Sequence, residues 1–455
     1  MNDNRAQPLW QPSLERIKAS NLKRFAESLE RDVGKRFDDY ESLHAWSCEA
    51  PDIFWAQVWR FTEIRSSRQW DAVLSDEEQF PGARWFEGAR LNFAENLLRH
   101  RSDKPALIAR LENGARKTVT YNELFDQVSE CAAGLRQLGV VSGDRVAGFM
   151  PNIPETIVAM LATASIGAIW SSCSPDFGIN GVMDRFGQIE PKVLFGCDGY
   201  FYNGKTIDTL PRLKAMCSKI ESIEQLVVVP VIQDAVAIDG FGNAVLFHDF
   251  LSAHRGAELF CEQLPFNHPL YIMYSSGTTG APKCIVHSAG GTLIQHLKEH
   301  QLHVDLKPSD RLFYFTTCGW MMWNWLVSGL ASGATLVLYD GSPFYPEAKS
   351  LIDLVEAEQV SIFGTSAKYL SALEKAGVNP NKTHDLAQLR TLLSTGSPLS
   401  QESFRYVYRD IKADLCLASI SGGTDIIACF VLGNPWLPVW EGEIQCRGLG
   451  MAVEI

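Results

Sequence analysis

The sequence lacks the features that mark membrane and exported proteins. Its most apolar stretch, residues 157–170, is 14 residues long and contains Thr163, Ser165 and Gly167. A membrane-spanning helix needs roughly 20 mostly apolar residues, so a buried core helix is expected here instead. Residues 1–13 hold no basic segment followed by an apolar core, so no secretory signal is expected. The sequence therefore predicts a protein that does not insert into a membrane.

Paired cysteines and an excess of basic charge are also missing. Eleven cysteines are scattered without a C-x-x-C pair, which fits reduced thiols in the cytoplasm and gives no zinc site. The 53 acidic and 41 basic side chains give a net charge of −12, which argues against nucleic acid as the main partner. A hydrophobic content of 46% with 21% charged residues is typical of a globular enzyme. We therefore expect a cytoplasmic protein, and nothing in the sequence indicates its oligomeric state.

The order of apolar patterns predicts an α/β fold with more than one core. The chain has 455 residues, too many for one ordinary core. Residues 13–34 have apolar side chains at near-helical spacing, and a second helix is expected from Pro51. From residue 105 onward, short apolar strands alternate with helices, which is typical of parallel βαβ units. We expect a helical extension at 1–100 and two α/β subdomains at 101–265 and 266–455.

One polar stretch interrupts this pattern and predicts a phosphate-binding loop. Residues 270–274 form an apolar run typical of a buried strand, and residues 275–283 then read SSGTTGAPK. Its glycines allow several backbone N–H groups to point to one side, and Lys283 adds a positive charge. The spacing excludes a Walker loop, because only two residues separate Gly277 from Gly280 and Cys284 follows the lysine. An ordinary solvated turn is the alternative.

This loop after a buried strand resembles the phosphate loop of the adenylate-forming superfamily of acyl-CoA synthetases, luciferases and peptide-synthetase adenylation domains. The resemblance implies the large N-terminal domain of that α/β fold, with two βαβ-type subdomains, parallel-rich sheets and a small β-rich region. It also implies that ATP is bound by the loop residues Ser275, Ser276, Gly277, Thr278, Thr279, Gly280 and Lys283.

Two later segments support the same resemblance. Residues 392–398 read as a buried strand that ends in a polar turn, and the superfamily's equivalent turn lines the adenine, which assigns Gly396, Ser397 and Pro398 to that role. Residues 418–425 match the segment whose threonine–acid pair faces the α-phosphate and Mg²⁺. Thr424, Asp425 and Lys283 are therefore the catalytic candidates. Asp425, where most of the superfamily has glutamate, is the metal-ligand candidate, since carboxylate oxygen suits Mg²⁺.

The acyl site is assigned by resemblance to the acetyl-CoA synthetases. Residues 315–325 carry three tryptophans in six positions, and core packing and a ligand wall are both open explanations. The resemblance implies substrate contacts from Trp320, Met321, Met322, Thr395, Gly422 and Gly423. Gly422 stands where the acetyl enzymes have a tryptophan that closes their pocket, so a larger acyl group than acetate is expected.

The combination SSGTTGAPKCIVH, FTTCGWMMWNW and SGGTDI resembles the acetoacetyl-CoA synthetase (acetoacetate–CoA ligase) family. The resemblance implies an acid–thiol ligase that uses ATP, Mg²⁺ and CoA to convert acetoacetate to acetoacetyl-AMP and then to acetoacetyl-CoA. Activation of another short or branched acid, or a non-catalytic nucleotide-binding remnant, are the alternatives. Family members continue beyond the position of Ile455, so we expect the ribose-binding segment and the small C-terminal lid domain to be absent and catalysis to be impaired.

Overall fold

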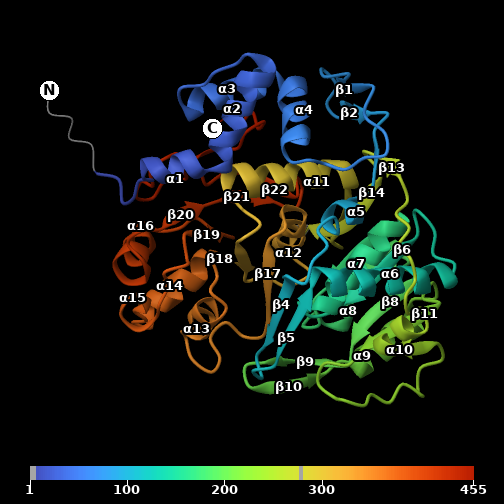
Figure 1. Cartoon of the computed structure of the whole chain (residues 1–455). Coiled ribbons are helices and arrows are strands. Elements are labelled where there is room, and N and C mark those ends of the chain that lie inside the picture. The colour runs from blue at the N-terminus through green and yellow to red at the C-terminus, as the bar shows by residue number, and fades with distance from the viewer. Residues whose placement is uncertain (1–6, 276–279, 455) are drawn as a thin grey trace, which may run out of the picture.

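The computed structural model describes residues 7–275 and 280–454, and two seven-stranded sheets dominate it (Figure 1). In the first sheet every neighbouring pair is parallel except the last, β14 with β15, which is an antiparallel hairpin. Helices normally cover both faces of a parallel sheet, so both sides of each strand are buried. This agrees with the apolar runs in these strands. The strands in sheet order are β12 (Ala244–Leu246), β11 (Gln225–Val229), β8 (Val193–Cys197), β6 (Arg145–Phe149), β7 (Ile169–Cys173), β14 (Pro269–Ser275) and β15 (Lys283–Ser288).

The second sheet has the same design, with parallel pairs throughout and one antiparallel hairpin, β4 with β5, at its edge. Its strands in order are β20 (Cys416–Ser419), β19 (Thr391–Thr395), β18 (Ile362–Ser366), β16 (Arg311–Tyr314), β17 (Thr335–Asp340), β4 (Pro105–Leu111) and β5 (Arg116–Thr120). A small antiparallel sheet follows, made of β21 (Ser421–Gly423), β22 (Ala428–Leu432) and β23 (Cys446–Arg447). The α/β class, the parallel-rich sheets and the small β-rich region agree with the sequence prediction.

The two large sheets exchange strands across the expected subdomain boundary. Strands β4 and β5 precede residue 265 but belong to the second sheet, and β14 and β15 follow it but belong to the first. Each exchanged pair is a hairpin that adds to the edge of the other sheet, and such pairing depends on distant residues rather than on local sequence. The sheets therefore do not divide the chain at residue 265, and the division into 1–100, 101–265 and 266–455 stays a prediction.

Helices cover both sheets and follow the predicted alternation. In the first half these are α5 (Phe93–Leu97), α6 (Tyr121–Gln137), α7 (Pro154–Ile166), α8 (Ile179–Ile189), α9 (Leu210–Lys219) and α10 (Phe247–Ser252). The second half has α11 (Ala289–Lys298), α12 (Met321–Ser328), α13 (Ser350–Ala357), α14 (Ala367–Lys375), α15 (Pro380–Thr383) and α16 (Gln401–Tyr406). Short two-stranded ribbons complete the fold: β1 (Ala72–Ser75) with β2 (Arg84–Glu87), β3 (Arg90–Leu91) with β13 (Leu264–Pro265), and β9 (Gly199–Tyr202) with β10 (Lys205–Asp208).

The apolar stretch at 157–170 is a core element, as expected. Pro154 occupies the first turn of α7, where a backbone N–H would have no partner within the helix, so the N–H that proline lacks is not missed. Nearly every side chain of this helix is buried. The helix ends at Gly167, which has the left-handed backbone typical of a helix stop. Trp170 therefore lies on β7 rather than on the helix. Among residues 7–275 and 280–454, no helix is long and apolar enough to cross a membrane.

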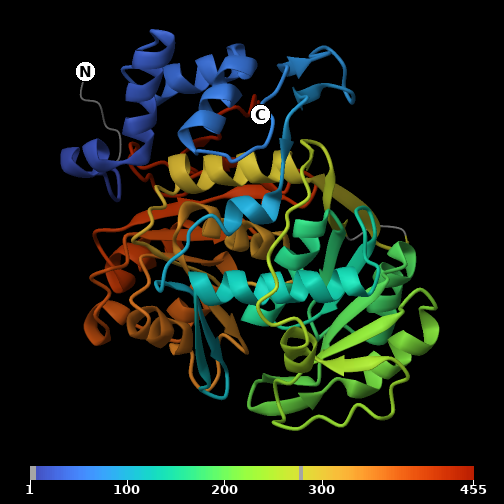
Figure 2. The same ribbon diagram turned by 45° about the vertical axis from the view of Figure 1, so that its right-hand side comes forward.

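The N-terminal helices form a separate layer above α11, in blue in both views (Figures 1 and 2). Residues 13–34 are two helices rather than one, α1 (Leu14–Ala19) and α2 (Asn21–Val33). The break falls at Ser20, which is extended and whose hydroxyl accepts from Lys23 N–H as an N-cap. The layer is completed by α3 (Tyr40–Glu49) and by α4 (Pro51–Phe61), which begins at the predicted proline.

Candidate active site

A cavity of about 570 Å³ lies where strands of the second sheet end. Its walls come from the ends of β16, β18, β19 and β20, from the start of α12, and from the small sheet β21–β22. The carboxyl ends of parallel strands are where α/β proteins place ligands. Of the predicted site residues, this one cavity brings together Trp320, Met321, Met322, Thr395, Gly396, Ser397, Pro398, Gly422, Gly423 and Thr424.

The predicted adenine turn follows β19 and opens into the cavity. Gly396 has a φ of 89°, a left-handed conformation that glycine adopts without the steric cost of a side chain. A Cβ built on Gly396 would meet no atom within 4 Å, so the space beside this turn is open. The neighbouring Thr395 hydroxyl donates to the Ile420 carbonyl at 3.1 Å, which ties the end of β19 to the segment that leads into β21.

The three phosphate-loop candidates that the structure describes, Ser275, Gly280 and Lys283, lie where β14 leads into β15, and they are not among the residues that line the cavity. Ser275 ends β14 and pairs directly with Lys283, the first residue of β15. Lys283 and Gly280 are exposed. The other four candidates, Ser276, Gly277, Thr278 and Thr279, lie outside the described residues. The hairpin adjoins the cavity through Tyr274, which lines it.

A buried histidine joins this hairpin to the predicted catalytic pair. His287 is on β15, and its Nε2 lies 2.7 Å from the Thr424 carbonyl oxygen. Burial is the main effect that lowers the pKa of His287, although the contact with the Thr424 carbonyl and, after it, the charge of Asp425 act in the opposite direction. A neutral imidazole that donates from Nε2 fits both the backbone contact and this pKa. His287, which carries no motif in the sequence, therefore holds Thr424 against strand β15.

Asp425 is exposed and directly follows Thr424, which lines the cavity. No group of three His, Cys, Asp or Glu side chains able to hold a metal ion occurs in the described ranges 7–275 and 280–454. An Mg²⁺ ion beside substrate phosphates usually keeps several waters and needs only one or two carboxylates, so a single accessible carboxylate fits such an ion. Asp425 thus has the chemistry and the accessibility of the predicted ligand.

The three tryptophans after β16 have different roles. Trp323 and Trp325 are core residues, and their indole N–H groups donate to Asn152 at 3.0 Å and to Glu299 at 2.9 Å. Trp320 is 59% exposed and lines the cavity beside Met321 and Met322. Core packing therefore accounts for Trp323 and Trp325, whereas Trp320 lines the cavity and its contact with a ligand stays a prediction.

Gly422 and Gly423 both line the cavity but tolerate side chains very differently. A Cβ at Gly422 would lie 2.0 Å from the Ala428 carbonyl oxygen across the β21–β22 pair. At Gly423 a Cβ would meet nothing within 4 Å. The open space next to the small sheet therefore lies at Gly423, whereas Gly422 allows two backbones to approach closely.

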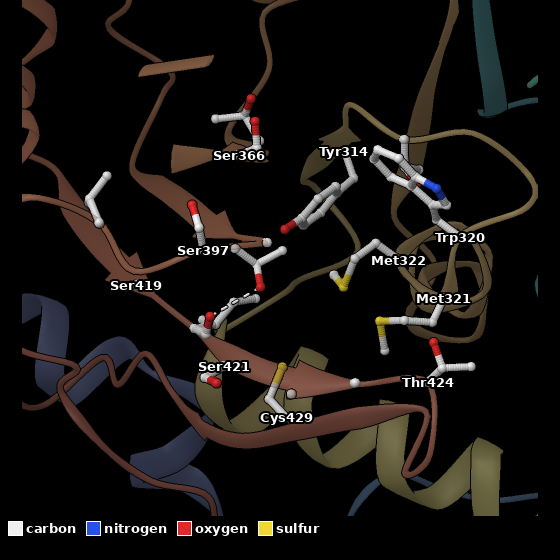
Figure 3. Close-up of a pocket in the computed structure, with 18 of the residues that line it drawn as sticks. Tyr314, Trp320, Met321, Met322, Ser366, Ser397, Ser419, Ser421, Thr424 and Cys429 are labelled. Atoms are coloured by element: carbon white, nitrogen blue, oxygen red, sulfur yellow. Dashed lines mark hydrogen bonds between the residues drawn. The ribbon is translucent and has the colours of Figure 1, made fainter. Parts of the chain in front are cut away.

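Several cavity residues have no local sequence signature and were not predicted as site residues. Figure 3 shows two of them, Tyr314 and Cys429, facing the same space as the predicted residues Ser397, Met321 and Met322. The one available signal was topological, because each parallel strand of the second sheet must end at the same edge. Applied to β16, β18 and β20, that rule points to the additional lining residues Tyr314, Thr365, Ser366 and Ser419.

A buried carboxylate supports the wall of the cavity from behind. Glu299 begins a π-helical turn (Glu299–His303) after α11 and accepts from Trp325 Nε1 and from the backbone N–H of Cys429, each at 2.9 Å. Lys298 Nζ lies 3.7 Å from Glu299 Oε1, and both side chains are fully buried. Burial raises the pKa of Glu299 and lowers that of Lys298. The carboxylate thereby fixes α12 and β22, which carry Met322 and Cys429, relative to each other.

Comparison with known proteins places this site in a family. Residues 93–434 match the family model "AMP-binding enzyme", and residues 40–97 match "Acetyl-coenzyme A synthetase N-terminus". The chain is 53% identical to acetoacetyl-coenzyme A synthetase of Rhizobium meliloti, over 98% of this chain and 69% of that protein. It is 49% identical to acetoacetyl-CoA synthetase of Gallus gallus (99% and 68%) and 43% identical to malonamoyl-CoA synthetase of Penicillium aethiopicum (98% and 65%). Acetoacetyl-CoA synthetase from Streptomyces lividans has the same fold, with a TM-score of 0.93 at 45% identity over 98% of this chain and 69% of that one.

Proposed function

The chain belongs to the acetoacetyl-CoA synthetase family of AMP-binding enzymes, and from this premise we propose that it activates acetoacetate. ATP and acetoacetate give acetoacetyl-AMP and pyrophosphate, and CoA then displaces AMP to give acetoacetyl-CoA. The observation that carries the proposal is the single cavity that joins the adenine-turn candidates Gly396–Pro398 to the acyl candidates Trp320–Met322, with Thr424 in its lining. We further propose that the enzyme acts in the cytoplasm.

The reaction needs alignment and charge neutralisation more than covalent help from the protein. A carboxylate is a weak nucleophile, and the α-phosphate that it attacks is itself negative. Ser275, Gly280 and Lys283, with the loop residues between 275 and 280, are proposed to hold the phosphates, and Lys283 supplies positive charge there. The Thr424 hydroxyl is proposed to donate to an α-phosphate oxygen, held in place through the His287 contact to its carbonyl.

The proposed metal is Mg²⁺, held by Asp425 together with ATP oxygens. When bound, it would neutralise phosphate charge during adenylation. Asp425 suits this role because its carboxylate is accessible and directly follows Thr424. The metal ion would complete its coordination with phosphate oxygens and water, as Mg²⁺ commonly does.

The acyl group is proposed to occupy the part of the cavity lined by Met321, Met322, Thr395 and Gly423. The open space at Gly423 supports an acid larger than acetate. The relatives' names point to two such acyl groups, acetoacetyl and malonamoyl, both of which carry a carbonyl oxygen on the third carbon. Activation of malonamate, or of another short acid, is therefore the second candidate.

The test is pyrophosphate release by the protein that carries this chain, with acetoacetate, malonamate, butyrate and acetate compared at matched concentrations. We expect acetoacetate to give the highest kcat/KM and acetate a much lower one. Equal turnover of acetate and acetoacetate would contradict the proposal, and a preference for malonamate would favour the second candidate. Calorimetric binding of ATP with Mg²⁺ to the 455-residue chain reports on the nucleotide site separately. If this chain binds ATP but the protein that carries it releases pyrophosphate with none of the acids, a nucleotide-binding remnant is indicated.

A further inference from the structure

A buried tyrosine hydroxyl points into the cavity. Tyr314 is the last residue of β16 and is only 2% exposed. Its hydroxyl is buried and has no hydrogen-bond partner among the residues that the structure describes. The side chain nevertheless lines the cavity, and Figure 3 shows its oxygen directed toward the space between Ser397 and Met322. Buried polar groups are nearly always hydrogen-bonded, so a bound ligand that donates or accepts a hydrogen bond would explain this hydroxyl.

The neighbouring strand is shaped to hold this ring. Tyr314 pairs with Gly364 of β18, and a Cβ on Gly364 would lie 2.1 Å from Tyr314 Cδ2 and 2.2 Å from Cε2. The φ of Gly364 is outside the left-handed region, so its backbone conformation does not require glycine. The glycine instead leaves the space in which the tyrosine ring lies. Any larger residue at position 364 would displace the ring.

The surroundings make the hydroxyl a hydrogen-bond donor in a mostly apolar environment. Met322 and Cys429 share the cavity wall with Tyr314, and Trp325 packs edge-on at a centroid distance of 6.0 Å. Burial is the main effect that raises the pKa of Tyr314 well above its usual value, so the phenol stays protonated. A protonated phenol in such a wall fits a carbonyl oxygen better than it fits a methylene group.

We propose that the Tyr314 hydroxyl donates a hydrogen bond to the oxygen on the third carbon of the acyl substrate, and thereby selects 3-oxo acids over simple aliphatic acids of the same length. This inference rests on the proposed function, because it names the residue that recognises the keto group. A site built to hydrogen-bond a substrate oxygen rejects an analogue without that oxygen, because the protein group is then left unpaired. Butyrate is that analogue for acetoacetate, since a methylene group replaces the carbonyl.

The test compares acetoacetate with butyrate in the protein that carries this chain, before and after Tyr314→Phe. We expect the ratio of kcat/KM for acetoacetate to kcat/KM for butyrate to fall roughly ten-fold or more. Most of this fall should come from a lower kcat/KM for acetoacetate. The matched control is Tyr369→Phe on α14. Its hydroxyl is also buried and has no partner in the described part of the chain, but Tyr369 does not line the cavity. This control should leave the ratio unchanged.

The melting temperature of the variants distinguishes substrate recognition by Tyr314 from a purely structural role of this residue. Because the Tyr314 hydroxyl has no protein partner in the described ranges, Tyr314→Phe should keep or raise the melting temperature while the ratio falls. A second variant, Thr365→Val, removes the other unpartnered hydroxyl of the cavity lining found among those residues, and should change the ratio less than Tyr314→Phe does.

The possible outcomes divide cleanly. A fall in the ratio with Tyr314→Phe, at unchanged stability and with Tyr369→Phe silent, supports the assignment. If the wild-type protein prefers acetoacetate and the ratio survives Tyr314→Phe, or if Thr365→Val alone removes it, the assignment of Tyr314 is wrong and the proposed function stands. If the wild-type protein prefers butyrate, the proposed function is wrong and the assignment falls with it.

Discussion

The two adjacent glycines of β21 should respond in opposite ways to an added side chain. Gly423→Val projects into open space, because a Cβ there meets no atom within 4 Å, and it should narrow the cavity of about 570 Å³ without straining the fold. Gly422→Ala places its methyl group 2.0 Å from the Ala428 carbonyl oxygen and 2.7 Å from Cys429 Cα. Because both contacts are to backbone, no side-chain rotation relieves them, and the β21–β22 pair must separate.

The magnitudes follow from these contacts. One added methylene-sized group in an acyl pocket changes discrimination by about 1–3 kcal/mol, or roughly 10–200-fold. Gly423→Val should therefore lower kcat/KM for acetoacetate by at least roughly 10-fold relative to acetate. Gly422→Ala should cost about 1–3 kcal/mol of unfolding free energy, the usual cost of overpacking. Pyrophosphate release with both acids and urea unfolding of each variant provide the two measurements.

Similar responses of Gly422 and Gly423 to an added side chain would contradict these expectations. An unchanged acetate-to-acetoacetate preference in Gly423→Val would show that the acyl group does not reach β21. Wild-type stability in Gly422→Ala would show that the small sheet is looser than its geometry indicates. The resemblance to acetyl-CoA synthetases pointed to Gly422→Trp as the change that closes the pocket. With this backbone, that substitution should damage the sheet before it narrows the cavity.

Three further predictions concern charged and buried groups. Asp425→Ala should lower Mg²⁺-dependent pyrophosphate release by at least ~100-fold at unchanged melting temperature, because the side chain is exposed. The control is Glu443→Ala, which removes another exposed carboxylate that does not line the cavity. Substantial residual activity in Asp425→Ala would place the metal ligand elsewhere. Glu299→Ala leaves Lys298 buried without its partner and should cost about 3–5 kcal/mol in urea unfolding; a loss below ~1 kcal/mol would refute a structural role for the pair. Burial lowers the pKa of His296 from 6.5 to about 4. The stability that the neutral His296 side chain contributes is therefore complete above pH 6.5 and is lost as the pH falls toward 4. Between pH 6.5 and pH 5 this residue should account for a loss of about 2 kcal/mol of unfolding free energy, at 1.36 kcal/mol per pH unit, and His296→Gln should flatten the slope; an unchanged slope would assign the acid sensitivity to other groups.

Much of the fold could be predicted because the signals were local. Helix α6 begins with a capping box, in which Thr120 accepts from Glu123 N–H and the Glu123 carboxylate accepts from Thr120 N–H, and α7 begins at Pro154. Such caps act within one helical turn, so they can be read from adjacent residues. The break at Ser20 was missed because the apolar spacing continues across it, whereas the structure interrupts the helix where Asn21 N–H donates to Asp305 at 2.7 Å.

The site was predictable only where a linear motif carries it. Gly396–Pro398, Thr424 and Met321–Met322 are short runs with a recognisable order, and the structure brings them to one cavity. Tyr314 and Glu299 have no such motif. Their positions depend on the pairing of β16 with β18 and on the packing of α11 against α12, which join residues far apart in the chain. Long-range pairing of this kind leaves little trace in adjacent residues.

The exchange of strands between the sheets also constrains how the chain can fold during synthesis. Strand β4 pairs with β17. Thr335 lies 230 positions after Pro105 in the chain, and this interval must be synthesised before the pair can form. At 5–20 residues per second, the ribosome needs roughly 10–50 s for this interval. Throughout it, one edge of the β4–β5 hairpin stays open, and open strand edges are sites of aggregation. A nascent chain of this protein should therefore depend on chaperones until β17 emerges, and cutting the gene at residue 265 should give two fragments that misfold when they are made separately.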